Sequence, residues 1–372
     1  MFICCRDVLF VQLGVKHTGC FFEAKDGVMT TARRKTVNYD DTCWYHCISR
    51  IARGLDTLEK YDRVLKRRIE RELSRLSKIF AIRVGGHAIM GTHFHFLLHA
   101  EVPKAKSWSS VEVIRRWALL CPPKNKKREV LRGEELQFWI DEKAKDKSFV
   151  EVLRERLLDL GWFHRFLKQP LSVFVNKLEA CSGTLFQGRF KSIAVIGFEA
   201  LLNVAIYIDL NPVAAGIVDV PEAAEYTSFR QRFENAIRSP VFTQMVERHQ
   251  NCSLSEGDVL SIEESNWLLP IENRSDSQVA TGMFDELTLV QYMILVDEAG
   301  RIPRVGKASI SEKAAALLDR LGINHDIWVR QQQLLGAAQF RGHYFCGSRE
   351  VLQRVAAREG KRYLMNLNGC PC

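Results

Sequence analysis

Apolar side chains recur along the chain with two different periods. Between residues 55 and 80 they return at every third or fourth position, which predicts an amphipathic helix with a basic outer face. Residues 42–49 are aromatic and β-branched and predict a strand before this helix, and the apolar runs 82–90 and 93–100 predict two more strands. Gly91-Thr92 joins these two runs, and a two-residue connection suits a β-hairpin.

Two histidines, His93 and His95, open the second run of this hairpin. Side chains alternate between faces along a strand, so both imidazoles point to one side, roughly 6.7 Å apart along the chain and close enough to reach one metal ion. His99 is on the same side but about 13 Å beyond His95, too far to share that ion. Phe94, Phe96 and Leu98 alternate with the histidines and are expected to face the core. A chance histidine pair on a half-buried strand would show the same pattern.

Further elements follow the hairpin. Residues 104–160 are charged and helical, and we interpret them as an insertion in the first domain, with Pro122-Pro123 ending its first helix. Leu171–Leu178 predicts another helix. Residues 185–196 end as an apolar strand, and Arg189 and Lys191 have the period-two spacing with which two cations on one strand face can hold a phosphate.

A helix is predicted over Glu199–Leu210, and Asn211-Pro212 is expected to end it because the residue before a proline avoids the α region. Tyr207 and Asn211 are four positions apart, so they share a helix face or its last turn. A tyrosine in such a helix is most often a core aromatic whose hydroxyl is hydrogen-bonded.

Composition narrows the class of protein. The 372 residues are 47% hydrophobic and carry a net charge of +9, which fits a polyanionic partner such as nucleic acid. The eleven cysteines are scattered without a C-x-x-C pair, which disfavours a zinc ribbon or thioredoxin motif and fits free thiols in a reducing cytosol. No apolar run reaches the roughly 18 residues that a membrane span needs. The apolar start lacks the basic region of a signal peptide.

Composition also divides the chain into four parts. We expect an N-terminal appendage over residues 1–35 and a main domain over residues 36–238. Residues 239–284 are interpreted as a linker, because Ser, Asn, Glu and Gly are frequent there. Residues 285–372 are expected to form a mostly helical extension.

Four segments occur in the order WYHCISR, GTHFHFLLHA, LFQGRFKS and YIDLNPVAAGIV. In this order and spacing they resemble the single-tyrosine HUH transposases, and among them the insertion sequence 200-like group and the REP-associated tyrosine transposases. The resemblance covers about residues 36–235, with weaker similarity in residues 295–301. It implies an α+β fold, a ferredoxin-like antiparallel sheet with helices on one face, together with a helical insertion and a mostly helical C-terminal region.

The resemblance also implies roles for individual residues. His93 and His95 match the two metal-binding histidines, Tyr207 matches the nucleophile, and Asn211 matches a further polar group that the family often supplies to the metal. The chain departs from the family at Gly91-Thr92, where Pro-Asn is usual. Candidates for contact with the DNA backbone are Arg50, Arg53, Arg189 and Lys191.

The function that the resemblance implies is a transposase that cleaves and rejoins single-stranded DNA through a 5′-phosphotyrosine, with Mg²⁺ or Mn²⁺ as cofactor. The expected partners are single-stranded or hairpin DNA and a second copy in a homodimer, since each chain has one nucleophilic tyrosine. No membrane is expected, and the expected location is the bacterial cytoplasm. Two alternatives stay open: a domesticated, inactive hairpin-DNA-binding protein, and an unrelated metallohydrolase that uses His93 and His95 with a carboxylate.

Overall fold

The computed structural model describes most of the main domain and parts of the C-terminal region. The described residues are 44–52, 61–238, 267–273, 282–305, 323–336 and 345–358, with the isolated positions 312, 315, 318, 319 and 360. The expected appendage (residues 1–35) and the candidate DNA contact Arg53 lie outside these residues.

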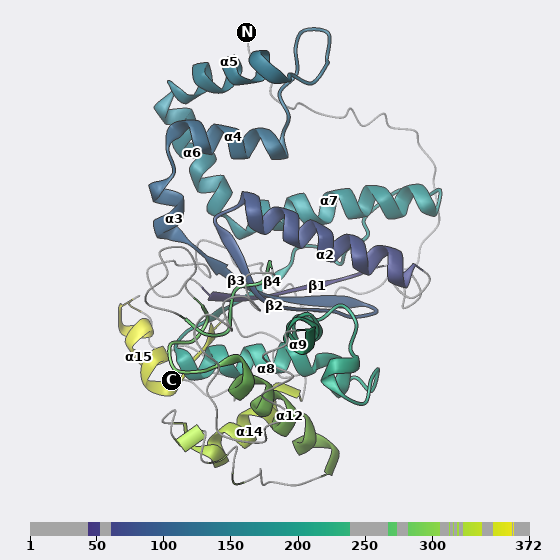
Figure 1. Cartoon of the computed structure of the whole chain (residues 1–372), viewed down its shortest axis with the longest axis vertical. Helices are drawn as coiled ribbons and strands as arrows, with labels where there is room; N and C mark the ends of the chain where they lie inside the picture. The colour runs from purple at the N-terminus through teal and green to yellow at the C-terminus, as the bar shows by residue number, and fades with distance from the viewer. Residues whose placement is uncertain are drawn as a thin grey trace, which may run out of the picture.

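One five-stranded sheet with the order β2-β3-β1-β4-β5 lies at the centre of the protein (Figure 1). Its strands are β1 (Trp44–Arg50), β2 (Ile82–Ile89), β3 (His93–Ala100), β4 (Lys191–Val195) and β5 (Phe345–Cys346). Strands β1 to β4 pair antiparallel, and β5 pairs parallel with β4. The early strand and the β-hairpin predicted from the sequence are therefore confirmed.

Helices cover both faces of this sheet, with α2 and α7 on one side and α8 and α9 on the other (Figure 1). Their bounds are α2 (Asp62–Ile79), α7 (Leu160–Leu178), α8 (Phe198–Ala214) and α9 (Ser228–Arg238). The expectation of helices on one face was wrong. The physical reason is that the central strands are apolar on both sides: Phe94 and Phe96 pack toward α2 and α7, whereas Leu97 packs toward α8.

Alternation along β3 follows the predicted pattern. Phe94, Phe96 and Leu98 are fully buried in the cluster that includes α2 and α7, which confirms their predicted core position. Helix α2 contributes the apolar stripe expected from its period, with Leu65, Ile69 and Leu73 buried in the same cluster, among others.

Four helices occupy the predicted insertion and extend the α2–α7 side of the molecule (Figure 1). They are α3 (Val102–Ser107), α4 (Ser110–Leu120), α5 (Gly133–Ala144) and α6 (Lys147–Leu158). The Ser109 hydroxyl caps α4 by accepting a hydrogen bond from the Glu112 N–H at 3.2 Å, and α4 ends before Pro122-Pro123 as predicted. Apolar side chains of α4 and α6 join the core cluster of the sheet, so the insertion shares the core of the main domain.

Helix α8 runs past the position where it was predicted to end. It continues through Pro212 to Ala214, so the predicted end at Asn211 was wrong. A proline in the last turn removes only one helical hydrogen bond, and the Ala215 N–H still donates to the Asn211 carbonyl at 3.0 Å. Burial of Pro212 and Val213 keeps the last turn against the core. Gly216, with φ 67°, then reverses the chain.

Part of the segment interpreted as a linker packs into the core. Leu268, Leu269 and Ile271 are buried, and the Leu269 N–H donates to the Val84 carbonyl of β2 at 2.8 Å. These residues add a layer over one edge of the sheet.

The described part of the C-terminal region is mostly helical, as predicted. Its helices are α12 (Leu289–Val305), α14 (His325–Gly336) and α15 (Arg349–Arg358). Helices α12 and α14 pack against α8 on the side away from the sheet (Figure 1). Among the described helices, none combines the length and apolar character that crossing a membrane requires.

The buried face of β3 sets the stability of the sheet. Phe96→Ala removes a fully buried ring, and we expect it to lower the free energy of unfolding by about 3–5 kcal/mol in urea denaturation. Phe138→Ala is the matched control because the Phe138 side chain is 69% exposed, and its effect should stay within about 0.5 kcal/mol. Equal losses for both variants would contradict this account of the core.

Candidate metal and tyrosine site

The pairing of β1 with β3 collects histidines and a cation on the face that α8 covers. Residues opposite one another in an antiparallel pair point to the same side. Arg50 is opposite His93, Ile48 is opposite His95, and His46 is opposite Leu97, two positions further along. Lys191 of β4 is opposite Ile48, so it also faces this side.

The two histidines predicted from the sequence lie together. The ring centroids of His93 and His95 are 4.9 Å apart, with an angle of 74° between the rings. His99 does not take part, since its ring lies against Trp44 at a centroid distance of 4.5 Å.

A third histidine, His46, belongs to the site and was missed in the sequence analysis. Its Nε2 atom is 2.8 Å from Nδ1 of His95, and the two rings are stacked. The signal available in the sequence was the alternation of His46 and Arg50 along the strand WYHCISR, but that pattern does not say which residue of another strand lies beside His46.

Hydrogen bonds at Nδ1 orient both metal-binding candidates. His95 uses Nδ1 toward His46, and Nδ1 of His93 is 2.9 Å from the Thr92 hydroxyl. If Nδ1 carries the proton toward these partners, Nε2 of each ring is the atom that could bind a metal ion. Nε2 of His95 is buried without a hydrogen-bond partner among the described residues, and a buried nitrogen of this kind fits a metal ligand.

Burial keeps the imidazoles neutral. It lowers the pKa of His46 to about 3, with a further contribution from the Lys191 charge. Burial and then the Arg50 charge lower the pKa of His93 to about 4, and burial holds the pKa of His95 well below its usual value. Neutral imidazole is the form that coordinates metal ions, so the three rings need no deprotonation at neutral pH.

Helix α8 places Tyr207 against these histidines. The Tyr207 ring lies 5.8 Å from the His95 ring and 5.9 Å from the His46 ring, nearly edge-on to both. Burial raises the pKa of the Tyr207 hydroxyl, while a hydrogen bond with Asn211 and the charge of Arg50 act in the opposite direction. The structure thus brings Tyr207, Asn211 and the histidines to one place.

Two of the predicted DNA-contacting cations lie at this site. Arg50 is exposed beside His93, and Lys191 is half-buried; burial, followed by the Arg50 charge, lowers the pKa of Lys191. Among the described charges that shift the pKa values of the site histidines, Lys191 and Tyr207, none is a carboxylate. The site therefore favours an anion such as a phosphate.

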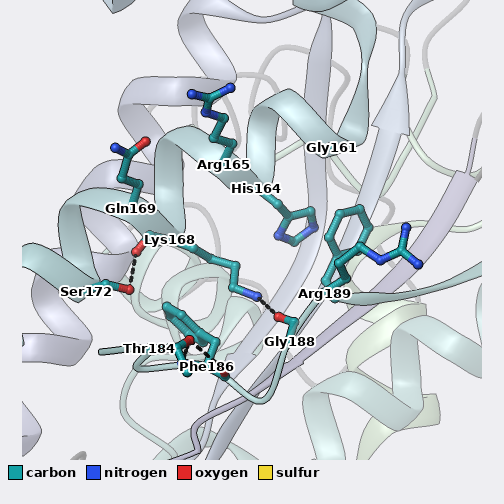
Figure 2. Close-up of a pocket in the computed structure, with 11 residues that line it drawn as sticks. Gly161, His164, Arg165, Lys168, Gln169, Ser172, Thr184, Phe186, Gly188 and Arg189 are labelled. Atoms are coloured by element: carbon teal, nitrogen blue, oxygen red, sulfur yellow. Dashed lines mark hydrogen bonds between the residues drawn. The ribbon is translucent and has the colours of Figure 1, made fainter. Parts of the chain in front are cut away.

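Arg189 does not join them, although it was paired with Lys191 in the sequence analysis. Strand β4 begins only at Lys191, so the expected common strand face does not extend to Arg189. Arg189 is exposed and lines a separate cavity beside α7 (Figure 2).

The donor set leaves an open site for a metal ion. In the part of the chain that the structure describes, no group of three or more His, Cys, Asp and Glu side chains is placed to hold a metal. The ligands that fit are two imidazoles, with the Asn211 amide as a further oxygen donor, and the remaining positions are left for water or substrate.

Buried polar contacts fix α8 from its other side. The Asp209 carboxylate accepts hydrogen bonds from the Tyr292 hydroxyl of α12 at 2.6 Å, from the Ser228 hydroxyl and from the Phe229 N–H at 3.1 Å. The Gln332 amide of α14 donates to the Asn203 side chain at 2.6 Å. These bonds connect the tyrosine helix to α9, α12 and α14, a role that the sequence analysis did not foresee for the C-terminal region.

Comparisons with known proteins give little beyond this geometry. No family model matches the chain, and no curated protein matches it. One solved structure, described as a REP-associated tyrosine transposase bound to a REP hairpin, is similar with 12% identity and a TM-score of 0.32. The match covers 55% of this chain and 86% of that chain. A structural similarity this low is not evidence for a function. The proposed function therefore depends on the residues of the site itself.

The contact between α12 and α8 can be tested through Tyr292. Tyr292→Phe leaves an oxygen of the buried Asp209 carboxylate without its hydrogen bond, and we expect the free energy of unfolding to fall by about 1–3 kcal/mol. In an Asp209→Ala background the same change should cost less than about 0.5 kcal/mol, because the partner is gone. A double-mutant cycle with no coupling energy would contradict the contact.

Proposed function

We propose that this protein is a transposase of the single-tyrosine HUH type, which cleaves and rejoins single-stranded DNA by transesterification. The observation that carries the proposal is the position of the Tyr207 ring, 5.8 Å from the His95 ring, on a face that also presents Arg50 and Lys191. The strand order β2-β3-β1-β4, with α2 between β1 and β2 and α7 between β3 and β4, is compatible with the ferredoxin-like sheet that the sequence resemblance implies.

In the proposed reaction the Tyr207 oxygen attacks the scissile phosphorus. A bond forms between this oxygen and phosphorus while the bond from phosphorus to the 3′ oxygen breaks, leaving a 5′-phosphotyrosine and a free 3′-OH. The phenol loses one proton and the 3′ oxygen gains one, so the step is balanced. One diester replaces another, and attack by a 3′-OH on the phosphotyrosine rejoins the strand without ATP.

The residues around Tyr207 have separate tasks in this proposal. Arg50 and Lys191 bind the phosphate, and the positive charge of Arg50 also stabilises the phenolate that forms during attack. His93 and His95, with Asn211, would hold Mg²⁺ or Mn²⁺. When bound, such an ion withdraws electron density from the phosphate oxygens and stabilises the charge on the leaving oxygen.

Hydrogen bonds from neighbouring side chains orient the two proposed metal ligands, His93 and His95. His46 orients His95 through Nδ1, and the Thr92 hydroxyl orients His93. Thr92 belongs to the turn in which this chain departs from the usual Pro-Asn of the family. In the proposal, the hydroxyl of this turn residue holds the His93 ring in place. His46 and Thr92 are therefore positioning residues in the proposal.

Hairpin or single-stranded DNA is the proposed substrate. The single chain already brings Tyr207 to the histidines, so strand cleavage needs no residue from a second copy. A homodimer stays a prediction that rests on the need for two tyrosines in a complete strand exchange.

Covalent adduct formation tests the proposal. Purified protein is incubated with Mn²⁺ and hairpin oligonucleotides that carry single-stranded flanks, and adducts are separated on a denaturing gel. We expect Tyr207→Phe to abolish the adduct while DNA affinity changes less than about threefold, and His93→Ala to lower adduct formation by about 100-fold or more. EDTA should stop the reaction, and added Mn²⁺ should restore it.

Tyr61→Phe provides a matched control, since Tyr61 precedes α2 and packs with the core cluster on the other face of the sheet. It should leave the adduct unchanged. Binding of the hairpin without any adduct would indicate the inactive DNA-binding protein instead. Cleavage that continues in Tyr207→Phe would indicate a hydrolase.

A further inference from the structure

A basic cavity of about 310 Å³ lies beside α7 (Figure 2). Helix α7 packs on the face of the sheet opposite to α8, which carries Tyr207. One wall is α7 and the other is the segment 184–190 that leads into β4. The polar side chains of the cavity are Arg165, Lys168, Gln169, Ser172, Thr184 and Arg189, together with His164 at its base.

The cavity concentrates positive charge. Arg165, Lys168 and Ser172 follow Gly161 at helical spacing, so they share one face of α7, and Arg189 comes from the opposite wall. Among the described residues that line the cavity there is no Asp or Glu. The lining residues therefore offer an anionic group positive charge and several hydrogen-bond donors. The Arg165 guanidinium lies over the Trp162 ring, 4.8 Å from its centre.

The walls of the cavity are held in place by internal contacts. The His164 ring, 2% exposed, stacks on Phe190 at a centroid distance of 3.7 Å. The Lys168 ammonium lies 4.4 Å from the centre of the Phe186 ring and donates to the Gly188 carbonyl at 2.9 Å. A lysine can donate up to three hydrogen bonds, so this bond is compatible with a further bond to a phosphate.

The segment that forms one wall also touches the tyrosine site. The Gln187 N–H donates to the Arg50 carbonyl at 3.0 Å, and Phe186 forms a bridge with Ile51 just beyond β1. The same segment then continues to Lys191, which faces the histidines. Arg189 and Lys191 are two residues apart, roughly 7 Å along an extended chain. The wall of the cavity and the cation at the tyrosine site therefore belong to one continuous segment of the chain.

We propose that this cavity binds a phosphodiester group of the single-stranded DNA next to the cleavage site. The inference rests on the proposed function, and it assigns the cavity one nucleotide rather than a duplex, because its volume is at the lower end of the range for small-molecule sites. Its continuity with Arg50 and Lys191 favours DNA over a phosphorylated peptide as the source of the phosphate.

Binding measurements test the cavity separately from the chemistry. The variant Arg165→Gln/Arg189→Gln is made in the Tyr207→Phe background, and affinity for a fluorescent single-stranded DNA oligonucleotide of mixed sequence is measured at several salt concentrations. We expect Kd to rise about tenfold or more, and the slope of log K against log salt to shrink by about 0.7, the value for one lost phosphate contact on a single strand. Both arginines are exposed, so the fold should be retained, and a thermal melt verifies this.

Arg330→Gln/Arg349→Gln is the matched control, because it removes the same charge from exposed positions of α14 and α15 that do not line the cavity. Its salt slope should stay unchanged. Equal losses in both double variants would overturn the inference. A phosphoserine peptide that binds the cavity more tightly than the DNA oligonucleotide would overturn it as well.

The two proposals fail in different ways. If wild-type protein forms the adduct but the cavity variant binds DNA normally, the inference about the cavity is wrong and the proposed function stands. If no adduct forms with wild-type protein but binding still depends on Arg165 and Arg189, the cavity stands and the proposed chemistry is wrong.

Discussion

The antiparallel register of β1 against β3 is the constraint on which the site depends. It sets Arg50 opposite His93 and brings His46 within hydrogen-bonding distance of His95. Because side chains alternate along a strand, a slip of one residue would turn His46 and Arg50 to the α2–α7 side and bury a guanidinium in an apolar core. Such a slip would also remove the fully buried Tyr45 and Cys47 from the core on the α2–α7 side. Packing of the core on the α2–α7 face of the sheet thus determines which polar side chains lie together on the α8 face.

Electrostatics divide the site into a neutral interior and a cationic rim. The imidazoles are buried and uncharged, and the bond between His46 and His95 offsets part of the cost of burying polar rings. Positive charge is supplied instead by Arg50 and Lys191, which are more accessible to solvent. In the proposed function, this division assigns the metal ion and the phosphate to different groups. A carboxylate ligand would neutralise the rim and weaken its attraction for DNA.

The tyrosine helix is positioned by parts of the chain that are far away in sequence. Asp209 points away from the histidines and is bound by Tyr292, while Asn203 is bound by Gln332. Helix α8 therefore lies between the sheet and the C-terminal helices, with Tyr207 on its sheet side. The C-terminal region acts as a support for α8 in the same chain, and its packing limits how far the phenol can move from the histidines.

The sequence by itself determined the local features of this protein. The hairpin, the common side of His93 and His95, and the fully buried Phe94 between them follow from a period of two along one strand. It did not show the position of His46, the helices on both faces, or the separation of Arg189 from Lys191. These depend on which strands pair, where β4 begins and what packs on α8, and such long-range contacts leave no periodic signal in a single chain. Even the helix through Pro212 continues because burial by distant segments outweighs the local preference of a proline.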